Sequence, residues 1–402
     1  MVAIVSYAFG TVEKVVPKKA FKGFSEVWVG DQFDWAWTSG HDCLERASYR
    51  RNDIGLYSLC GEISDFDKSK LRKMLNVEGE IKFFGGEEES AVNALDYVII
   101  GIESGKYKSA LVGASELSLE KCMCEKPYEK NLLRKAGEWP IQQIAQIKLQ
   151  AMKDLGIEER QFAGVPVKDH FHGSLNLAAQ YSDRESNKKI TADRVLKSPY
   201  VEGCGPLRVL EKCFDNSGGS ISIILTNDEE AKKHKKPVYF EGFGKSNKRG
   251  DEEKLYDIPS MRFAVEKACT GKISIDELNL LQIPDLGTPL EIIGLVNIGL
   301  IRSGEAKEIL SKTFEKANEP ATHEKPWAYE IGRKVFVNTD GGDKAGGRPG
   351  PSTSFLRKTV ETYQQLSGTA GERQIENPKF GVTVQTTDWR NPEFAAYLWG
   401  SR

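Results

Sequence analysis

The sequence lacks any apolar run long enough to cross a bilayer. Its longest apolar stretch, residues 290–301, contains Glu291 and Asn297 and falls far short of the roughly 20 residues that a spanning helix needs. The first ten residues are apolar but have neither a basic segment nor a cleavage pattern, so they predict a strand rather than a signal peptide. We therefore expect a cytoplasmic protein with no membrane partner.

Neither sign of charge is in excess. Lys and Arg number 56 and Asp and Glu number 58, which gives a formal net charge of -2. A balanced chain offers no global attraction to nucleic acid or to an anionic surface. Nucleic acid is therefore not an expected partner.

Paired cysteine motifs are also missing. The seven cysteines include only one close pair, Cys122 and Cys124, and no CxxC motif is matched by a second one. An odd number of cysteines in a long chain excludes a disulfide framework, and the spacing excludes a zinc ribbon. Free thiols in a reducing compartment and no metal site are expected.

Short apolar runs alternate with longer segments of helical period. Strands are predicted at residues 2–6, 54–59, 78–84 and 109–113. Between the last two, residues 88–104 predict a helix, because apolar residues recur at three- and four-residue spacing: Ala91, Leu95, Val98, Ile99 and Ile102. This rhythm is typical of an α/β protein with a largely buried sheet.

Three parts are predicted along the chain. Residues 1–118 with 205–255 form one α/β half, and residues 256–402 form the other. Between them, residues 119–204 are rich in charge and turns and predict an inserted loop domain. Further helices are expected at 32–48, 139–155, 174–182, 261–270, 289–301 and 353–367, and further strands at 220–225, 238–240, 277–281 and 380–385.

The C-terminal third carries an ordered series of motifs. Asn338 begins Asn-Thr-Asp-Gly-Gly, Gly347 begins Gly-Arg-Pro-Gly, and a predicted helix then leads to Gln-Leu-Ser-Gly and Ala-Gly-Glu-Arg-Gln, which ends at Gln374. This series resembles the thiolase pattern of NxxGG, GHPxGATG, a helix and QLrGeaGxRQ. The stretches 165–181, 206–219 and 111–118 resemble further motifs of sterol-carrier-protein-type thiolases, whereas residues 1–75 match poorly.

The resemblance implies a five-layer αβαβα fold of two similar halves with a loop domain. It implies chemistry on acyl-CoA, in which a carbon–carbon bond beside the thioester is made or broken. It also implies two-fold pairing with a thiolase-fold partner, either a second copy or an active paralogue, through residues 80–84. Some related thiolases have a small zinc-ribbon/OB-fold partner. No resident cofactor is implied, and CoA or acyl-CoA is the expected ligand.

The residues that perform thiolase chemistry are replaced. Thiolases use a cysteine thiolate at a helix N-terminus, where the helix dipole and backbone N–H groups stabilise negative charge. Aligning the motif places Glu88 at the cysteine and Ser90 at the serine two residues later. Glu88 is expected to be a stabilising first-turn acid, with a direct chemical role as the alternative.

The bases are replaced as well. The histidine of GHP becomes Arg348, which stays protonated and cannot accept a proton. Pairing of Arg348 with Glu88 is one hypothesis, and contact with solvent or a CoA phosphate is the other. The catalytic histidine or asparagine of the HDxF/NEAF motif becomes Pro284, while Asp285 keeps the neighbouring acid. The glycine-rich C-terminal loop becomes residues 384–389, which contain no glycine.

Other candidates are weaker. His170, in a region that thiolases place near CoA, and Ser90 are the expected ligand contacts. Cys43 follows His41 by two residues, but near neighbours on a helix do not face each other. The aromatic residues Trp28, Phe33, Trp35 and Trp37 predict either a partner surface or core packing.

Three hypotheses for function follow. The favoured one is a non-catalytic subunit that pairs with an active thiolase-fold chain. The alternatives are an active acyl-CoA acyltransferase or C–C lyase with altered chemistry, and a protein that binds CoA esters without turnover.

Overall fold

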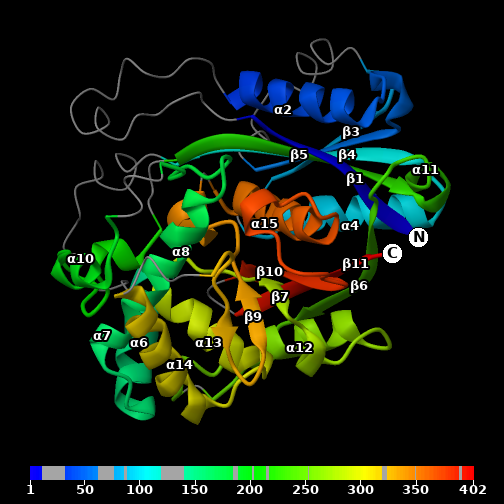
Figure 1. The fold of residues 1–402 in the computed structure, drawn as a ribbon. Coiled ribbons are helices and arrows are strands. Elements are labelled where there is room, and N and C mark those ends of the chain that lie inside the picture. Colours follow the sequence, from blue (N-terminus) through cyan, green and yellow to red (C-terminus); the bar gives the residue numbers. More distant parts are fainter. Residues whose placement is uncertain are drawn as a thin grey trace, which may run out of the picture. The chain divides into compact units, whose positions relative to one another are not determined.

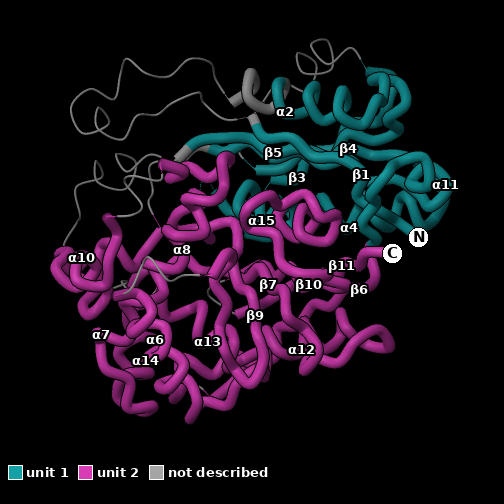
Figure 2. Tube along the Cα trace, viewed as in Figure 1, with its two compact units in different colours: residues 1–119, 215–239, 348–360 teal, residues 120–214, 240–347, 361–402 magenta. Residues whose placement is uncertain are grey.

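The computed structural model describes residues 1–10, 32–61, 77–85, 88–118, 140–183, 189–201, 203–213, 217–251, 253–318, 324–348, 350–388 and 392–402. The chain divides into two compact units (Figure 2). The first comprises Met1–Leu119, Asp215–Tyr239 and Arg348–Val360, and the second comprises Glu120–Phe214, Phe240–Gly347 and Glu361–Arg402. The three-part division expected from the sequence stays a prediction.

The first unit is built on a mixed sheet with the strand order β3-β2-β4-β5-β1. Strands β3, β2 and β4 run parallel, and β5 is antiparallel to both β4 and β1. The strands are β1 (Val2–Gly10), β2 (Leu56–Cys60), β3 (Glu80–Phe84), β4 (Ser109–Ser118) and β5 (Ser217–Asn227). Strand β2 is buried at every position, as expected for a parallel strand covered on both faces.

Two helices cover opposite faces of this sheet (Figure 1), namely α2 (Gln32–Ala47) and α4 (Ser90–Glu103). Successive side chains of β2 point to opposite faces of the sheet, and each face contacts one of these helices. Tyr57 and Leu59 belong to the core that contains Cys43 of α2. On the other face, the Ser58 hydroxyl donates to the Ala94 carbonyl of α4. The short helix α11 (Asp228–Ala231) follows β5, and the turn η1 (Arg51–Asp53) precedes β2. The parallel strands thus end beside the start of α4.

The second unit repeats this strand arrangement. Its order is β6-β11-β10-β7-β9-β8, and within it β9, β7 and β10 are parallel while β11 is antiparallel to β10. The series β9-β7-β10-β11 therefore repeats β3-β2-β4-β5. The strands are β6 (Val238–Ser246), β7 (Leu280–Gln282), β8 (Tyr329–Glu330), β9 (Lys334–Val337), β10 (Phe380–Asp388) and β11 (Glu393–Ser401).

One hydrophobic core joins this sheet to helices of the second unit, including α12 and α13. The helices are α6 (Pro140–Leu155), α7 (Glu159–Phe162), α8 (Gly164–Ser174), α10 (Ala192–Lys197), α12 (Pro259–Cys269), α13 (Thr288–Ile298), α14 (Ala306–Ala317) and α15 (Pro351–Leu366), of which α15 begins in the first unit. Short helical turns are η4 (Val209–Glu211), η5 (Ile275–Glu277), η6 (Ser303–Glu305), η8 (Gly342–Gly346) and η9 (Gly371–Arg373).

The predicted α/β class is confirmed, with one misplaced helix. The expected helix at 174–182 is wrong, because α8 runs from Gly164 to Ser174 and turns follow it. Asn176 causes the change: its side-chain oxygen accepts from the Ala178 N–H at 3.1 Å, a local bond that competes with helix continuation. The elements α14, β8, β9 and β11 were not predicted from the sequence.

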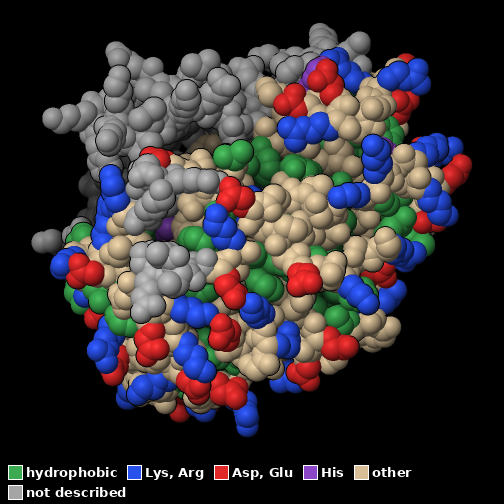
Figure 3. All heavy atoms as spheres, in the orientation of Figure 1, with side chains coloured by type: hydrophobic (Ala, Val, Ile, Leu, Met, Phe, Trp, Pro, Cys, Tyr) green, Lys and Arg blue, Asp and Glu red, His purple; other side chains and the backbone are tan. Residues whose placement is uncertain are grey.

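The surface of the described residues carries mixed charge. On the face in Figure 3, Lys and Arg side chains are interspersed with Asp and Glu. No helix in the described ranges is both long enough and apolar enough to span a membrane. Of the aromatic residues near the N-terminus, Trp28 lies outside the described residues, and the side chains of Phe33, Trp35 and Trp37 are likewise not described.

Candidate functional site

An ion pair occupies the start of α4 in the first unit. Arg348 Nη2 lies 2.9 Å from Glu88 Oε1, and the two side chains are only 18% and 12% exposed. This is the pairing hypothesised from the sequence. A guanidinium cannot lose its proton at neutral pH, so Arg348 cannot serve as a base. Its partner Glu88 is a carboxylate, which is a weak nucleophile towards a thioester.

Ser90, the first residue of α4, is fully buried. Its hydroxyl lies 2.5 Å from the hydroxyl of Ser352, at the start of α15. The Ser90 hydroxyl therefore contacts another buried side chain within the first unit, and it is not accessible to a ligand from solvent. Its expected role in substrate binding stays a prediction.

A buried carboxylate that the sequence reasoning missed lies beneath the same region. Glu116, near the end of β4, accepts from the backbone N–H groups of Ser352 (3.2 Å) and Thr353 (2.7 Å) and from the Thr353 hydroxyl (2.8 Å). Burial raises the pKa of Glu116, and these hydrogen bonds act against the shift. Glu116 thus caps α15 from a neighbouring strand. Its place in the stretch 111–118, which resembles a thiolase motif, was a signal in the sequence but did not indicate this contact.

The described cysteines do not replace the missing nucleophile. Cys60 lies near Glu116 at the end of β2, but burial raises the pKa of its thiol well above the usual value, and the thiol donates to the Gly113 carbonyl at 3.4 Å. Burial also raises the pKa of Cys43 to about 12 and of Cys269 to about 11. Cys204 and Cys213 are buried as well, and none of the five described cysteines forms a disulfide. Thiols held neutral in this way are inert.

In the second unit, Asp285 and Pro284 follow β7 and are buried. Both Asp285 carboxylate oxygens accept from the Asp343 backbone N–H at 3.0 Å, and Oδ2 lies 3.0 Å from Lys344 Nζ. A Cβ at Gly342, whose φ is +58°, would lie 2.1 Å from the same oxygen. Asp285 therefore fixes the glycine-rich turn η8, and Pro284 contributes no polar side chain.

The contacts of Asp285 belong to a larger buried network of charge. Lys344 Nζ also lies 2.9 Å from Asp169 Oδ2, while Lys168 Nζ lies 2.9 Å from Asp169 Oδ1 and 2.6 Å from Glu291 Oε1. The Tyr329 hydroxyl donates to Glu291 at 2.6 Å. The three carboxylates that contact the two lysines, and the lysines themselves, are inaccessible to solvent, so each contact acts at low dielectric.

Both lysines of this network are held as ammonium ions. Burial alone would lower the pKa of Lys344, but Asp169, Asp285 and Glu291 outweigh it and raise that pKa. The pKa of Lys168 is likewise raised by Asp169 and Glu291 against the effect of burial. The carboxylates of Asp169, Asp285 and Glu291 lie close enough to hold a metal ion, but the two ammonium groups already contact them.

The histidines of α8 have internal positions. His172 Nδ1 lies 3.1 Å from the Asn338 carbonyl, and its Nε2 accepts from the Trp327 N–H at 3.0 Å. Burial and the neighbouring Lys168 lower the pKa of His172 to about 3. His170 is 3% exposed and meets Tyr181 edge-on at 6.3 Å. Both histidines lie in α8, within the segment that the sequence predicts as an inserted loop domain, and the ligand role of His170 stays a prediction.

The expected C-terminal loop is a strand over most of its length. Strand β10 continues to Asp388, and its residues from Val384 to Thr387 are buried. Trp389 lies outside the described residues. Strand formation turns successive backbone groups to opposite edges, so this segment cannot gather N–H groups around one point as a glycine-rich loop does.

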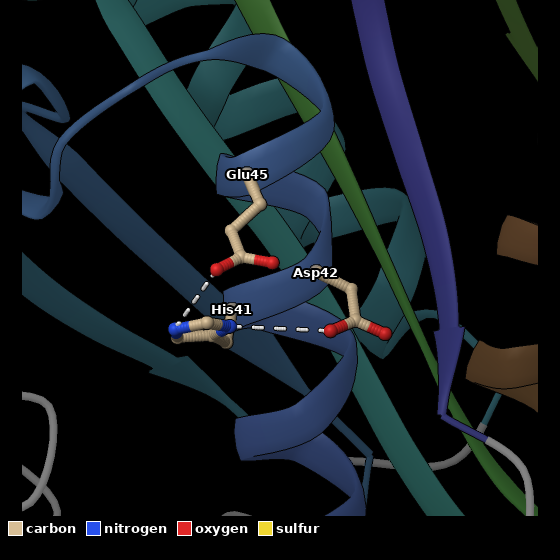
Figure 4. A group of neighbouring side chains, drawn as sticks. All are labelled: His41, Asp42 and Glu45. Atoms are coloured by element: carbon tan, nitrogen blue, oxygen red, sulfur yellow. Dashed lines mark ion pairs between the residues drawn. The ribbon is translucent and has the colours of Figure 1, made fainter.

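An exposed group on α2 is shown in Figure 4. His41 lies 3.9 Å from Asp42 and 3.7 Å from Glu45, and all three side chains are at least 41% exposed. Cys43 points to the opposite side of the helix and is fully buried, with its thiol 3.7 Å from the Ser6 hydroxyl. A Cys43–His41 pair is therefore excluded.

Comparisons with known proteins agree with this fold. Residues 248–391 match the family described as thiolase C-terminal domain-like. The chain is 26% identical over 258 residues to an acetyl-CoA acetyltransferase from Methanothermobacter thermautotrophicus, and the match spans 61% of each chain. Over its whole length it is similar to the solved structure of an Ltp2-ChsH2(DUF35) aldolase, with a TM-score of 0.75, 16% identity and 97% of that chain covered.

A second solved structure has the same fold. It is an acetyl-CoA acetyltransferase from Syntrophomonas wolfei, with a TM-score of 0.65, 12% identity and coverage of 99% of this chain and 98% of that one. At these identities the structural likeness establishes the fold, while the sequence matches carry the evidence for relationship.

Proposed function

We propose that this chain, whose sequence matches and fold support the thiolase superfamily, acts in acyl-CoA metabolism as a thiolase-fold subunit that forms no acyl-enzyme itself. The ion pair between Glu88 and Arg348 carries the proposal. Thiolysis and Claisen condensation both need a nucleophile activated by a base. A carboxylate paired with a permanent cation supplies neither function.

The second unit supports the same conclusion. Pro284 replaces a side chain that would polarise the thioester carbonyl, and β10 replaces the glycine-rich loop. These changes lie at separate places in the sequence and remove different parts of the chemistry. A subunit of this kind would work by pairing with an active thiolase-fold chain, shaping that partner's site, and a small zinc/OB-fold protein is a second partner in the proposal.

The first experiment examines association and acylation together. Native mass spectrometry of the protein purified from its own cells should show a heteromer with a thiolase-fold paralogue. Incubation of the isolated chain with acetyl-CoA should leave its intact mass unchanged. A homodimer that accumulates an acetyl group, or that catalyses thiolysis, would contradict the proposal.

A gain-of-function variant supplies the matched control. E88C with R348H restores a cysteine at a helix start beside a histidine, where the helix end and an adjacent imidazole lower a thiol pKa. In a C122S/C124S background, this variant should be alkylated by iodoacetamide at neutral pH much faster than its parent, whose five described cysteines are buried. Equal alkylation rates would show that the start of α4 cannot activate a nucleophile.

A C–C lyase is the second candidate, because a similar solved structure is an aldolase in complex with a DUF35 protein. Retro-aldol cleavage of a β-hydroxyacyl-CoA needs no acyl-enzyme. A base takes the hydroxyl proton, the bond between Cα and Cβ breaks, and its electron pair forms a thioester enolate that is then protonated. Glu88 is the group proposed for that base, and this candidate therefore requires the Glu88–Arg348 ion pair to open when the substrate binds. Schiff-base chemistry at Lys168 or Lys344 is disfavoured, because their raised pKa values keep both amines protonated.

The lyase candidate and a pure binding role have separate tests. Lyase activity of the purified complex that E88Q abolishes, with binding of the acyl-CoA intact, would support the lyase. Thermal stabilisation by CoA esters without turnover would support the binding role, since a ligand bound only by the native state raises apparent stability. The absence of both would leave the subunit role.

A further inference from the structure

Strand β3 ends the sheet of the first unit. Among the described strands it pairs only with β2, in parallel register from Leu56 opposite Glu80 to Cys60 opposite Phe84. An edge strand is a template for a strand from another chain. The residues along this edge therefore influence which chain can be added.

The direction of the backbone places Lys82 at the centre of such a pairing. The Glu80 N–H donates to the Gly55 carbonyl at 3.0 Å, so Glu80 and, by alternation, Lys82 turn their backbone groups towards β2. Ile81 turns its own groups the opposite way. In an added antiparallel strand, Lys82 would then occupy a non-hydrogen-bonded position, where opposing Cα atoms approach to about 4.5 Å.

The ammonium groups near Lys82 outnumber the carboxylates that contact them. Lys82 Nζ lies 3.3 Å from Glu80 Oε1, and Glu80 Oε2 accepts from Lys106 Nζ at 3.0 Å and from the Tyr107 hydroxyl. Hydrogen bonds from Tyr107 and Lys106 lower the pKa of Glu80 to about 2. One carboxylate thus serves two ammonium groups, and the Lys82 side chain remains 45% exposed.

A second copy of this chain is a poor match for the edge. In an antiparallel pair, two residues that face each other have their side chains on the same side of the sheet. When the two strands are identical and related by a two-fold axis, this condition is met only if the axis passes between one residue and its own copy. The register that uses all five residues of β3 centres on Lys82 and sets ammonium against ammonium, which is destabilising. A register centred on Ile81 would face Lys82 with Glu80, but it needs Gly79 in the strand, and the chain bends there. A register centred on Phe83 would face Lys82 with Phe84, but it needs Gly85, which lies beyond the end of β3.

We infer that the β3 edge selects a chain of different sequence, one that adds an antiparallel strand with an Asp or Glu side chain opposite Lys82. This inference rests on the proposed role as a subunit of a heteromer and names the chemistry of the partner's edge. The partner's acid would neutralise the surplus ammonium that a second copy would double.

Mixing wild type with K82E tests the inference without knowledge of the natural partner. The two proteins, one carrying a mass label, are mixed in equal amounts and examined by native mass spectrometry at low salt. Mixed dimers should exceed their statistical share, because Lys82 then faces an acid. K82Q should tighten self-association about two- to fivefold, the effect of relieving one like-charge cross-strand pair. K235E is the control, since Lys235 is an exposed lysine beside β6, away from β3 in the strand order.

Several outcomes would overturn the inference. Statistical mixing, or no dimer in any mixture, would remove the edge as the determinant of pairing. A wild-type homodimer weakened by K82E would indicate the Ile81-centred register. A paralogue complex from cells that K82E leaves intact would remove this inference but keep the proposed function. Preferential formation of mixed dimers by a chain that proves catalytically active alone would keep this inference but remove the proposed function.

Discussion

At the residue scale, the second unit contains buried ammonium and carboxylate groups, each of which is stabilised by its partners of opposite charge. Lys344 has two carboxylate neighbours within 3.0 Å, and none of the three side chains reaches solvent. Removing water from an ion costs several kcal/mol, and a paired geometry of this quality offsets that cost. The loss of one partner therefore leaves an unbalanced charge inside the unit.

Lys344→Met should lower the free energy of unfolding by about 3–5 kcal/mol, because Asp169 and Asp285 lose a shared counter-ion. Urea denaturation at neutral pH measures the change. Lys312→Met is the matched control, since the Lys312 ion pair with Glu308 is exposed, and it should be close to neutral. A Lys344→Met variant as stable as this control would mean that the network is not held by its charges.

A second residue-scale prediction concerns pH. The pKa of His172 is about 3 in the folded chain and about 6.5 in a free side chain, so the unfolded state takes up the proton first as pH falls. This contribution is present in full above about pH 6.5 and is lost progressively towards pH 3. From pH 7 to pH 5 the linkage amounts to about 2 kcal/mol.

His172→Gln should remove that part of the pH dependence. Between pH 7 and pH 5 the free energy of unfolding of the wild type, measured by denaturation, should fall by about 2 kcal/mol more than that of the variant. The variant can be less stable at pH 7, because the hydrogen bonds to Asn338 and Trp327 change. Parallel pH profiles would contradict the assignment of a neutral buried imidazole.

At the element scale, helix α15 starts with a cap supplied by another element. Its first N–H groups have no partner inside the helix, and the Glu116 carboxylate of β4 accepts from two of them. Gly350 makes this approach feasible, since a Cβ there would lie 2.4 Å from the carboxylate carbon. The cap ties the start of α15, next to Arg348, to the sheet of the first unit.

Glu116→Gln should destabilise the chain by about 1.5–3 kcal/mol, the usual value of hydrogen bonds to a charged acceptor. The amide offers one oxygen and turns an N–H group towards other donors. Thr353→Val, which removes only the hydroxyl contact, should cost about 1 kcal/mol. Equal effects in urea denaturation would show that the backbone cap adds nothing beyond the threonine contact.

The sequence predicted the elements better than their ends. The period of α4 and the apolar runs of β2 and β4 identified those elements, since local burial decides them. Strand β9 has only four residues and therefore gave no clear local pattern, whereas α14 was overlooked although its buried residues Ala306, Ile309 and Leu310 recur at helical spacing. Asn176 ended a predicted helical segment through one side-chain bond that periodicity does not reveal.

The site was predictable where a motif fixed the register. Glu88 and Arg348 were found as replacements within recognisable motifs and Asp285 as a retained acid, and pairing of Glu88 with Arg348 was one of two hypotheses for Arg348. Glu116 and Lys344 were missed because their partners are distant in sequence. Only the folded chain brings Glu116 to Thr353 and Lys344 to Asp169.

At the scale of the whole molecule, function is proposed to depend on assembly. If the native partner binds only the folded chain, its free energy of binding adds to apparent stability. The melting temperature of the natural complex should therefore rise with protein concentration and exceed that of the isolated chain. Differential scanning fluorimetry over a dilution series measures this, and a concentration-independent melting temperature would indicate that the chain acts alone.

Lys168 and Lys344, the two buried lysines of the charge network in the second unit, are counter-ions that are covalently part of the chain. A carboxylate cluster loaded from solution gains and loses its cation with the supply of metal, and its fold then follows that supply. Lys168 and Lys344 are attached to the chain and remain present whether chelators or divalent ions are scarce or abundant. The second unit is therefore expected to keep its stability unchanged through swings in cellular metal content.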